Sequence, residues 1–138
     1  MTVTLPPDYR PHEDEPFMND YQREYFRQKL LSWRNELLKE AGETLQHLQE
    51  GGTQEADIAD RAQAEADRTL ELRTRDRARK LISKIDAALI RIEEGIYGYC
   101  EDTHEPISLR RLEARPIATM SIEAQERHER MERTHRED

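Results

Sequence analysis

The side chains whose types and spacing could do chemistry include a pair of aspartates. Asp57 and Asp60 stand three positions apart in the run EADIADRA. Carboxylates at the start of a helix accept hydrogen bonds from free backbone N–H groups and interact favourably with the helix dipole. Two nearby carboxylates could also hold Mg²⁺, which often takes one or two such ligands. Capping alone explains one aspartate, so both interpretations stay open at this point.

A basic stripe is the second candidate. Arg77, Leu81 and Lys84 are spaced i, i+4 and i+7, which places them on one face of a helix. Guanidinium and ammonium groups that converge on one spot can bind phosphates, and arginine offers paired donors. The alternative is that the two cations only flank a leucine of the helix packing. The spacing favours neither interpretation.

The composition indicates which elements position these groups. The chain has 138 residues, of which 35% are hydrophobic and 38% are charged, and its formal net charge is −8. Long helices with narrow apolar stripes fit such a composition better than a large spherical core does. An acidic chain argues against direct DNA binding, since that depends on cations that neutralise phosphates. Cys100 is the only cysteine, which excludes an intramolecular disulfide and suits a reducing cytosol.

Two long helices follow an irregular leader. Residues 1–17 are broken by four prolines, and Tyr9 and Phe17 are candidates to dock them. Asn19 or Asp20 can cap the first helix, and Gly51-Gly52 ends it. The apolar stripe of the first helix is Phe26, Leu30, Trp33, Leu37, Ala41, Thr44 or Leu45, and Leu48.

The second helix is expected from about residues 57–60 to about residue 94, a length of about 50 Å. Its apolar stripe is Leu70, Thr74, Ala78, Leu81, Ile85, Leu89, Ile92 and Ile96. Two such stripes joined by a short turn predict an antiparallel coiled coil over 18–95, with an acidic tip near 51–62.

The chain changes character after Gly95. Residues 96–120 contain turn formers and two prolines, which predicts a compact non-helical module, and the helical pattern returns over 121–138. The predicted fold is therefore mainly α, with a long antiparallel coiled-coil hairpin, a small globular module and a C-terminal helix. No N-terminal signal and no apolar run of about 20 residues is visible, so a cytoplasmic protein without a membrane span is expected.

Three runs in this order resemble one known family. They are LELRTRDRARKLI at 70–82, GYCE at 98–101 and RRLEARP at 110–116. Together with D-x-x-D-x-A at Asp57, Asp60 and Ala62, they are similar to the DksA branch of the DksA/TraR family over about residues 18–125. The resemblance implies a bacterial transcription regulator without enzymatic activity, acting as a monomer, whose partner is RNA polymerase.

The resemblance also implies roles for both charged groups. Asp57, Asp60 and Ala62 match the family tip that enters the secondary channel of the polymerase, although Ile58 stands where the family often has proline. The residues that match the family's site for guanosine tetraphosphate (ppGpp), which the polymerase shares, are Arg77, Leu81, Lys84 and Arg115. A further basic position of that site corresponds to Gln125.

The family's structural zinc site is degenerate in this chain. The resemblance places its four thiolates at Cys100, Thr103, Ser121 and Ala124, so one thiolate remains. His104 and His128 share no recognised ligand spacing with Cys100 and are expected to be solvated. We therefore expect no zinc, and packing of apolar residues in its place. Cys100 is then a small, partly buried residue more than a reactive thiol.

Two other functions remain as alternatives. A Gre-like transcript-cleavage factor would use the tip carboxylates to hold Mg²⁺ on the polymerase. A structural coiled-coil adaptor would need neither tip nor basic stripe. The motifs of the module favour the regulator, which would alter the stability of promoter complexes together with ppGpp.

Overall fold

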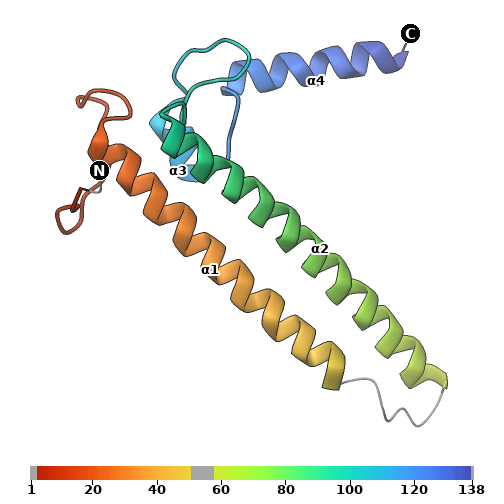
Figure 1. Cartoon of the computed structure of the whole chain (residues 1–138). Coiled ribbons are helices and arrows are strands. Elements are labelled where there is room, and N and C mark those ends of the chain that lie inside the picture. Colours follow the sequence, from red (N-terminus) through yellow and green to blue (C-terminus); the bar gives the residue numbers. More distant parts are fainter. Residues whose placement is uncertain (1–2, 51–57, 138) are drawn as a thin grey trace. The chain divides into compact units, whose positions relative to one another are not determined.

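The computed structural model describes residues 3–50 and 58–137, and its described part is mainly helical (Figure 1). The helices are α1 (Asp20–Glu50), α2 (Ile58–Glu94), α3 (Leu109–Ala114) and α4 (Ile122–Glu137). The described ranges contain no strand beyond one isolated bridge between Tyr99 and Pro106. These elements confirm the predicted fold class. The expected turn at Gly51-Gly52 lies outside the described residues, and no helix within the described ranges could cross a membrane.

The chain divides into two compact units. Unit 1 comprises Met1–Leu30 and Ala87–Asp138, and unit 2 comprises Leu31–Asp86. Both α1 and α2 run from one unit into the other. The coiled coil predicted over 18–95 is therefore divided between the two units, and its ends form part of the same unit as the small module.

Unit 2 is a pair of antiparallel helical segments. Arg34 Nε lies 2.7 Å from Asp86 Oδ1, which joins the beginning of the α1 segment to the end of the α2 segment. Leu37, Ala78 and Ile85 are buried, and Ile85 has no exposed surface. Two helices without a third layer cover only a narrow stripe of each other.

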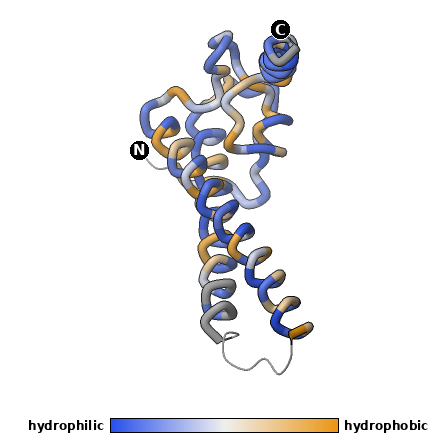
Figure 2. Tube along the Cα trace, turned by 90° about the vertical axis from the view of Figure 1, so that its right-hand side faces the viewer, coloured by the Kyte–Doolittle hydropathy of each residue, from blue (hydrophilic) through white to orange (hydrophobic). Residues whose placement is uncertain are grey.

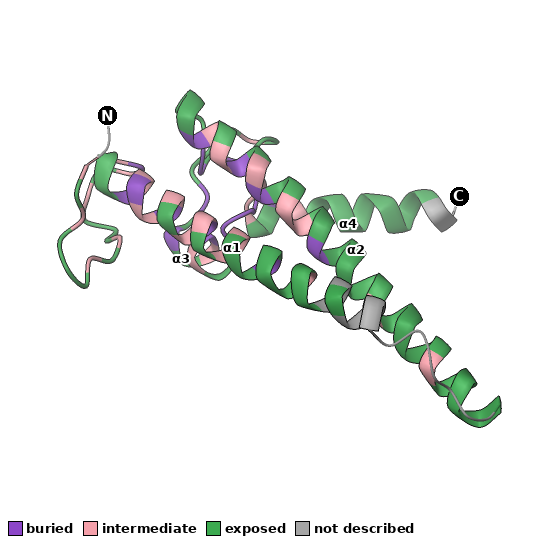
Figure 3. Cartoon of the chain, turned by 60° about the horizontal axis from the view of Figure 1, so that its bottom comes forward, coloured by how far each residue is buried: buried purple, intermediate pink, exposed green. Residues whose placement is uncertain are grey.

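The apolar stripe predicted for α2 is wrong in the part nearest the tip. Leu70 is 63% exposed and Thr74 is also exposed. Figure 3 shows α2 almost entirely exposed before Ala78. Ile96, predicted as the last residue of the stripe, follows the end of the helix and is exposed as well. Apolar residues at helical spacing indicate a helix but do not show that a neighbouring element covers them.

The largest buried side chains belong to unit 1, where apolar residues of several segments meet. The Phe26 and Tyr97 rings pack with their centroids 5.7 Å apart. The core of unit 1 consists of Met18, Phe26, Leu30, Ala88, Ile92, Tyr97, Cys100, Ile107, Leu109, Leu112, Ile117, Ala118 and Ala124. Figure 2 shows hydrophobic positions interspersed with strongly hydrophilic ones along the chain. Part of the apolar cluster expected for the module is confirmed, but Ile96, Tyr99 and Ile122 are exposed.

Local signals explain where the elements of unit 1 begin and end. Gly95 ends α2 in a Schellman motif, in which its φ is +78° and Ile96 N donates to Arg91 O over 3.0 Å. The module was predicted to be non-helical, but α3 forms within it. Ser108 caps α3 by accepting a hydrogen bond from Arg111 N, and the good helix formers LRRLEA follow.

The leader is an ordered part of unit 1. Asn19 Oδ1 accepts a hydrogen bond from Gln22 N over 2.8 Å, so Asn19 caps α1. The Tyr9 ring packs against Tyr21 and Tyr25 at centroid distances of 5.8 and 6.2 Å. The Phe17 ring meets the Tyr99 ring edge-on at 5.3 Å. Tyr9 and Phe17 thus dock the leader, as expected.

Gly98 allows the leader to approach the module closely. Its φ is +91°, a conformation that favours glycine. A Cβ at this position would lie 2.8 Å from Met18 Cε and 3.2 Å from Phe17 Cζ. The absence of a side chain at Gly98 therefore determines how closely Phe17 and Met18 can pack.

Candidate functional site

The acidic tip is exposed where the structure describes it. Asp60 lies in the first turn of α2, and Asp60 and Ala62 are both exposed. Ile58, which begins the helix, is 83% exposed. Asp57 lies outside the described residues. The described part of the tip is therefore a helical turn that lies at the surface.

The basic stripe lies on the second half of α2 in unit 2. Arg77 and Lys84 are exposed, and Leu81 between them is half-buried. The helical spacing brings these three residues to one face, with the cations on either side of the leucine. Arg115 belongs to unit 1, so the predicted phosphate site is divided between the two units.

The backbone around Arg115 is held on both sides. Arg115 follows α3 as its C-cap, and its N–H donates to Arg111 O over 2.7 Å. The buried Tyr97 hydroxyl donates to Pro116 O over 2.8 Å. Arg111 Nε donates to Met120 O over 2.8 Å. An exposed guanidinium on such a backbone can meet an anion with little ordering of the chain.

Glu113 anchors α3 to α1, and the sequence analysis did not identify this role. Its Oε2 accepts hydrogen bonds from Tyr25 Oη (3.0 Å) and Lys29 Nζ (2.8 Å). Burial favours the protonated carboxyl, but the bonds from Lys29 and Tyr25 outweigh it and lower the pKa of Glu113. Burial and the bond to Glu113 raise the pKa of Tyr25 to about 12. The partners are more than 80 positions apart, so no local spacing could have revealed them.

The four positions of the family's zinc site retain an ordered arrangement around Cys100. Its side chain is buried, and its Sγ accepts a hydrogen bond from Ser121 N over 3.4 Å. Burial raises the pKa of the thiol, but bonds from the Thr103 side chain and from the N–H groups of Thr103, Ser121 and Asp102 lower it to about 6. The Cys100 side chain is thus more deeply buried than the partly buried residue expected, and its thiol is more acidic than that of a free cysteine, because the turns concentrate N–H donors on a buried sulfur.

The donor set does not fit zinc. Ala124 is fully buried and carries no ligand atom. Ser121 Oγ accepts a hydrogen bond from Ala124 N, and Thr103 Oγ1 accepts one from Glu105 N. One thiolate and two hydroxyls used by the backbone cannot complete a tetrahedral site of four thiolates. Within the described ranges no three His, Cys, Asp or Glu side chains are grouped to hold a metal, and His104 and His128 are exposed.

Gln125 is the residue that the resemblance matches to a further basic position of the family's ppGpp site. It is half-buried near the start of α4, where its Nε2 donates to Glu129 Oε1 over 3.2 Å. The amide therefore carries no charge that could attract a phosphate. Any anion site that includes this part of unit 1 depends on Arg115 alone among the positions predicted here.

A helical hairpin with an exposed acidic turn, continuous with a module built around a degenerate zinc site, defines a recognisable class. Residues 22–92 match the model described as DnaK suppressor protein DksA, N-terminal domain. Residues 95–130 match the prokaryotic dksA/traR C4-type zinc finger. The chain belongs to the DksA/TraR family, which confirms the resemblance noted in the sequence.

Similar proteins cover nearly the whole chain. The RNA polymerase-binding transcription factor DksA of Caulobacter vibrioides is 70% identical over 131 residues, which are 95% of this chain and 92% of that protein. The protein of the same name from Escherichia coli K12 is 44% identical over 115 residues, 83% of this chain and 76% of that protein. The structure of transcription factor DksA2 from Pseudomonas aeruginosa has a TM-score of 0.78 at 44% identity and covers 85% of this chain and 90% of that one.

Proposed function

We infer that this chain is a transcription factor that binds RNA polymerase and does no chemistry of its own. The observation that carries this inference is the 70% identity, over nearly the full length of both chains, to an RNA polymerase-binding transcription factor. The family match covers the hairpin and the module alike. Three functions were considered from the sequence, and no observation specifically supports the other two, a cleavage factor and a structural adaptor.

We propose that the tip near Asp60 enters the secondary channel of the polymerase and alters the stability of promoter complexes. The exposure of Asp60 and Ala62 supports this, because both residues lie at the surface of the first turns of α2. A pair of helices is also narrow enough to enter a channel, since each helix with its side chains is about 10–12 Å wide. Asp57 would act beside Asp60 at the same tip.

Asp60→Asn tests the role of the tip. The change removes one charge and keeps the shape, so the free energy of unfolding should change by less than about 1 kcal/mol. Inhibition of a ribosomal RNA promoter in vitro should collapse while binding to the polymerase persists. Asp76→Asn is the control, because Asp76 is exposed on the same helix about 24 Å further from the tip. If the Asp60→Asn variant still inhibits the promoter fully, the tip role is wrong and Asp60 contributes only to the stability of the helix.

We propose that ppGpp binds where Arg77, Leu81, Lys84 and Arg115 meet the polymerase. The exposure of the three cations and the fixed backbone of Arg115 support a site for phosphates. Three exposed cations on an acidic chain would hold a multiply charged nucleotide only weakly, so the polymerase would have to complete the site. The isolated protein should therefore bind ppGpp weakly, and the complex should respond to it strongly.

Alanine variants test this site. Arg115→Ala and Lys84→Ala should each reduce the synergy with ppGpp, since a charge-assisted hydrogen bond contributes roughly 1.5–3 kcal/mol. Basal inhibition without ppGpp should persist. Arg75→Ala is the control, because Arg75 is exposed on the opposite face of α2. If both test variants respond to ppGpp as the wild type does, the basic stripe does not bind ppGpp and its cations are only solvated side chains of the hairpin.

We further propose that the protein works as a zinc-independent monomer in the cytoplasm, where its polymerase partner acts, and that it binds no specific DNA sequence. The poor donor set around Cys100 supports zinc independence. Elemental analysis should find far less than one zinc per chain, and chelators should leave the helix content unchanged. One tightly bound zinc per chain, with unfolding by a chelator, would contradict this.

A further inference from the structure

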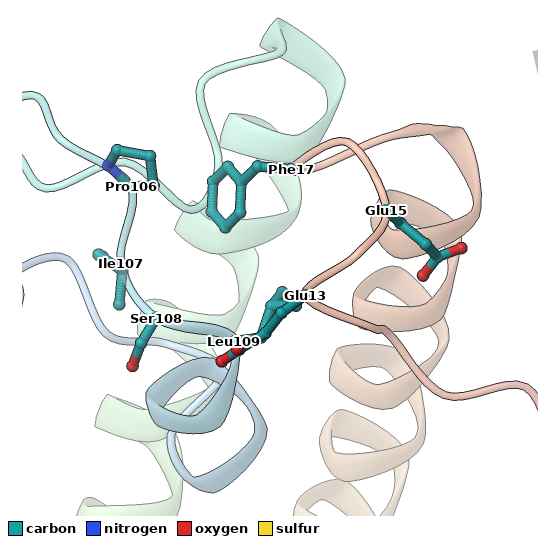
Figure 4. Close-up of a pocket in the computed structure, with 7 residues that line it drawn as sticks. All are labelled: Glu13, Glu15, Phe17, Pro106, Ile107, Ser108 and Leu109. Carbon is teal, nitrogen blue, oxygen red and sulfur yellow. The ribbon is translucent and has the colours of Figure 1, made fainter.

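A small cavity in unit 1 lies between the leader and the loop before α3 (Figure 4). Its volume is about 170 Å³. The leader contributes Glu13, Glu15 and Phe17, and residues 106–109 form the opposite wall. None of these residues belongs to the tip, the basic stripe or the degenerate zinc site.

The leader wall of the cavity is held by hydrogen bonds. Tyr9 Oη and His12 N each donate to Glu15 Oε1 over 2.9 Å. Gln22, whose side chain is fully buried, donates from Nε2 to His12 O over 3.2 Å. Figure 4 shows Glu15 turned away from residues 106–109, whereas Phe17 faces Pro106. The Glu15 carboxylate thus accepts hydrogen bonds within the leader, whereas the Phe17 ring lines the cavity.

The opposite wall is equally fixed. Ile107 N donates to Gly98 O over 2.7 Å, and Ser108 Oγ accepts the capping bond from Arg111 N. Ile107 and Leu109 line the cavity but are buried, so little of their apolar surface is accessible there. Pro106 is exposed at its edge. Both walls exist before any partner arrives, which reduces the entropy lost on binding.

Glu13 places a negative charge at this apolar cavity. Its side chain is exposed, and within the described ranges no hydrogen bond or ion pair joins it to another residue. Figure 4 shows its side chain over Leu109, at the edge of the cavity. An apolar occupant would bury this carboxylate without a partner, which is unfavourable, and an anion would be repelled.

We propose that this cavity receives one lysine or arginine side chain of RNA polymerase. The aliphatic stem would lie on Phe17, Pro106 and Leu109, and the cationic group would meet the Glu13 carboxylate. Long basic side chains combine an apolar stem with a charged end, which is the combination that these walls offer. A guanidinium could in addition stack on the Phe17 ring. This inference rests on the proposed function and adds a second polymerase contact, made by unit 1.

Charge reversal at Glu13 tests this contact. The full-length Glu13→Lys variant should bind RNA polymerase core enzyme about tenfold more weakly than the wild type in competition binding at moderate salt, and Glu13→Gln about three- to fivefold more weakly. Asp14→Lys is the matched control: Asp14 is the next residue, its side chain is 95% exposed, and it does not line the cavity. It should weaken binding less than twofold.

The outcomes separate this inference from the function on which it rests. Helix content and thermal midpoint should be unchanged in all three variants, because Glu13 and Asp14 are exposed. Equal binding by the wild type and Glu13→Lys would overturn the cavity contact and leave the proposed function intact. Equal losses in Glu13→Lys and Asp14→Lys would also overturn it, since they would show only a general effect of charge. A wild type that fails to bind polymerase would overturn the proposed function itself.

Discussion

Gly98→Ala should be far more damaging than the same change at Gly95, although the two glycines stand three positions apart. Both have a positive φ, +78° at Gly95 and +91° at Gly98, so alanine is strained at each by about 1–2 kcal/mol. No atom lies within 4 Å of a Cβ built on Gly95. A Cβ on Gly98 would lie 2.8 Å from Met18 Cε and 3.2 Å from Phe17 Cζ, so these packed side chains must shift, which adds about 1–3 kcal/mol.

The difference between the two variants measures how strongly the leader is docked. Urea unfolding followed by circular dichroism should show a loss of about 2–5 kcal/mol for Gly98→Ala and about 1–2 kcal/mol for Gly95→Ala. Met18→Ala, which removes a buried side chain, should cost less in the Gly98→Ala background than in the wild type, because it removes the terminal methyl group that the new Cβ meets. Equal losses at the two glycines, or strictly additive losses in the double variant, would refute this account of the leader.

The remaining predictions concern the phosphate site and the buried thiol. Gln125→Lys should shift the ppGpp response to lower concentrations and leave basal inhibition unchanged; an unaltered titration curve would remove this position from the site. The pKa of Cys100 falls from about 9 in the unfolded chain to about 6 in the folded one, so ionisation stabilises the fold above pH 9 and its contribution is lost as the pH falls through 6. The stability advantage of the wild type over Cys100→Ser should therefore shrink by about 2 kcal/mol from pH 8 to pH 5.5 in urea titrations, and a constant difference would show that the sulfur is not ionised.

The helical architecture could be predicted because its signals are local. Asn19 caps α1 and Gly95 ends α2, and both are visible in the sequence as single residues with a known conformational preference. The burial of the stripes could not be predicted in the same way. Leu70 continues the helical spacing of Ala78 and Ile85 but is 63% exposed, since burial depends on what covers a face and not on the face itself.

The candidate sites likewise include features that the sequence could predict and features that it could not. Helical spacing groups Arg77, Leu81 and Lys84, whereas the roles of the tip, the basic stripe and the positions around Cys100 come from the family pattern and stay predictions. The bonds from Tyr25 and Lys29 to Glu113 could not be foreseen, because they join segments more than 80 residues apart. The lowered pKa of Cys100 was missed for a related reason: its hydrogen bonds from N–H groups come from two separate turns, and backbone donors leave no mark in the sequence.

The division into two units has a consequence for how the chain folds during synthesis. Unit 2 is a continuous segment, Leu31–Asp86, whereas unit 1 is assembled from the first 30 residues and from Ala87 onward. The hairpin segments can therefore pair while the ribosome is still translating, but Phe26 must wait for Tyr97, and Phe17 must wait for Tyr99. Closing such distant contacts is entropically slow, so the nascent leader and the start of α1 remain without their core until the module has emerged.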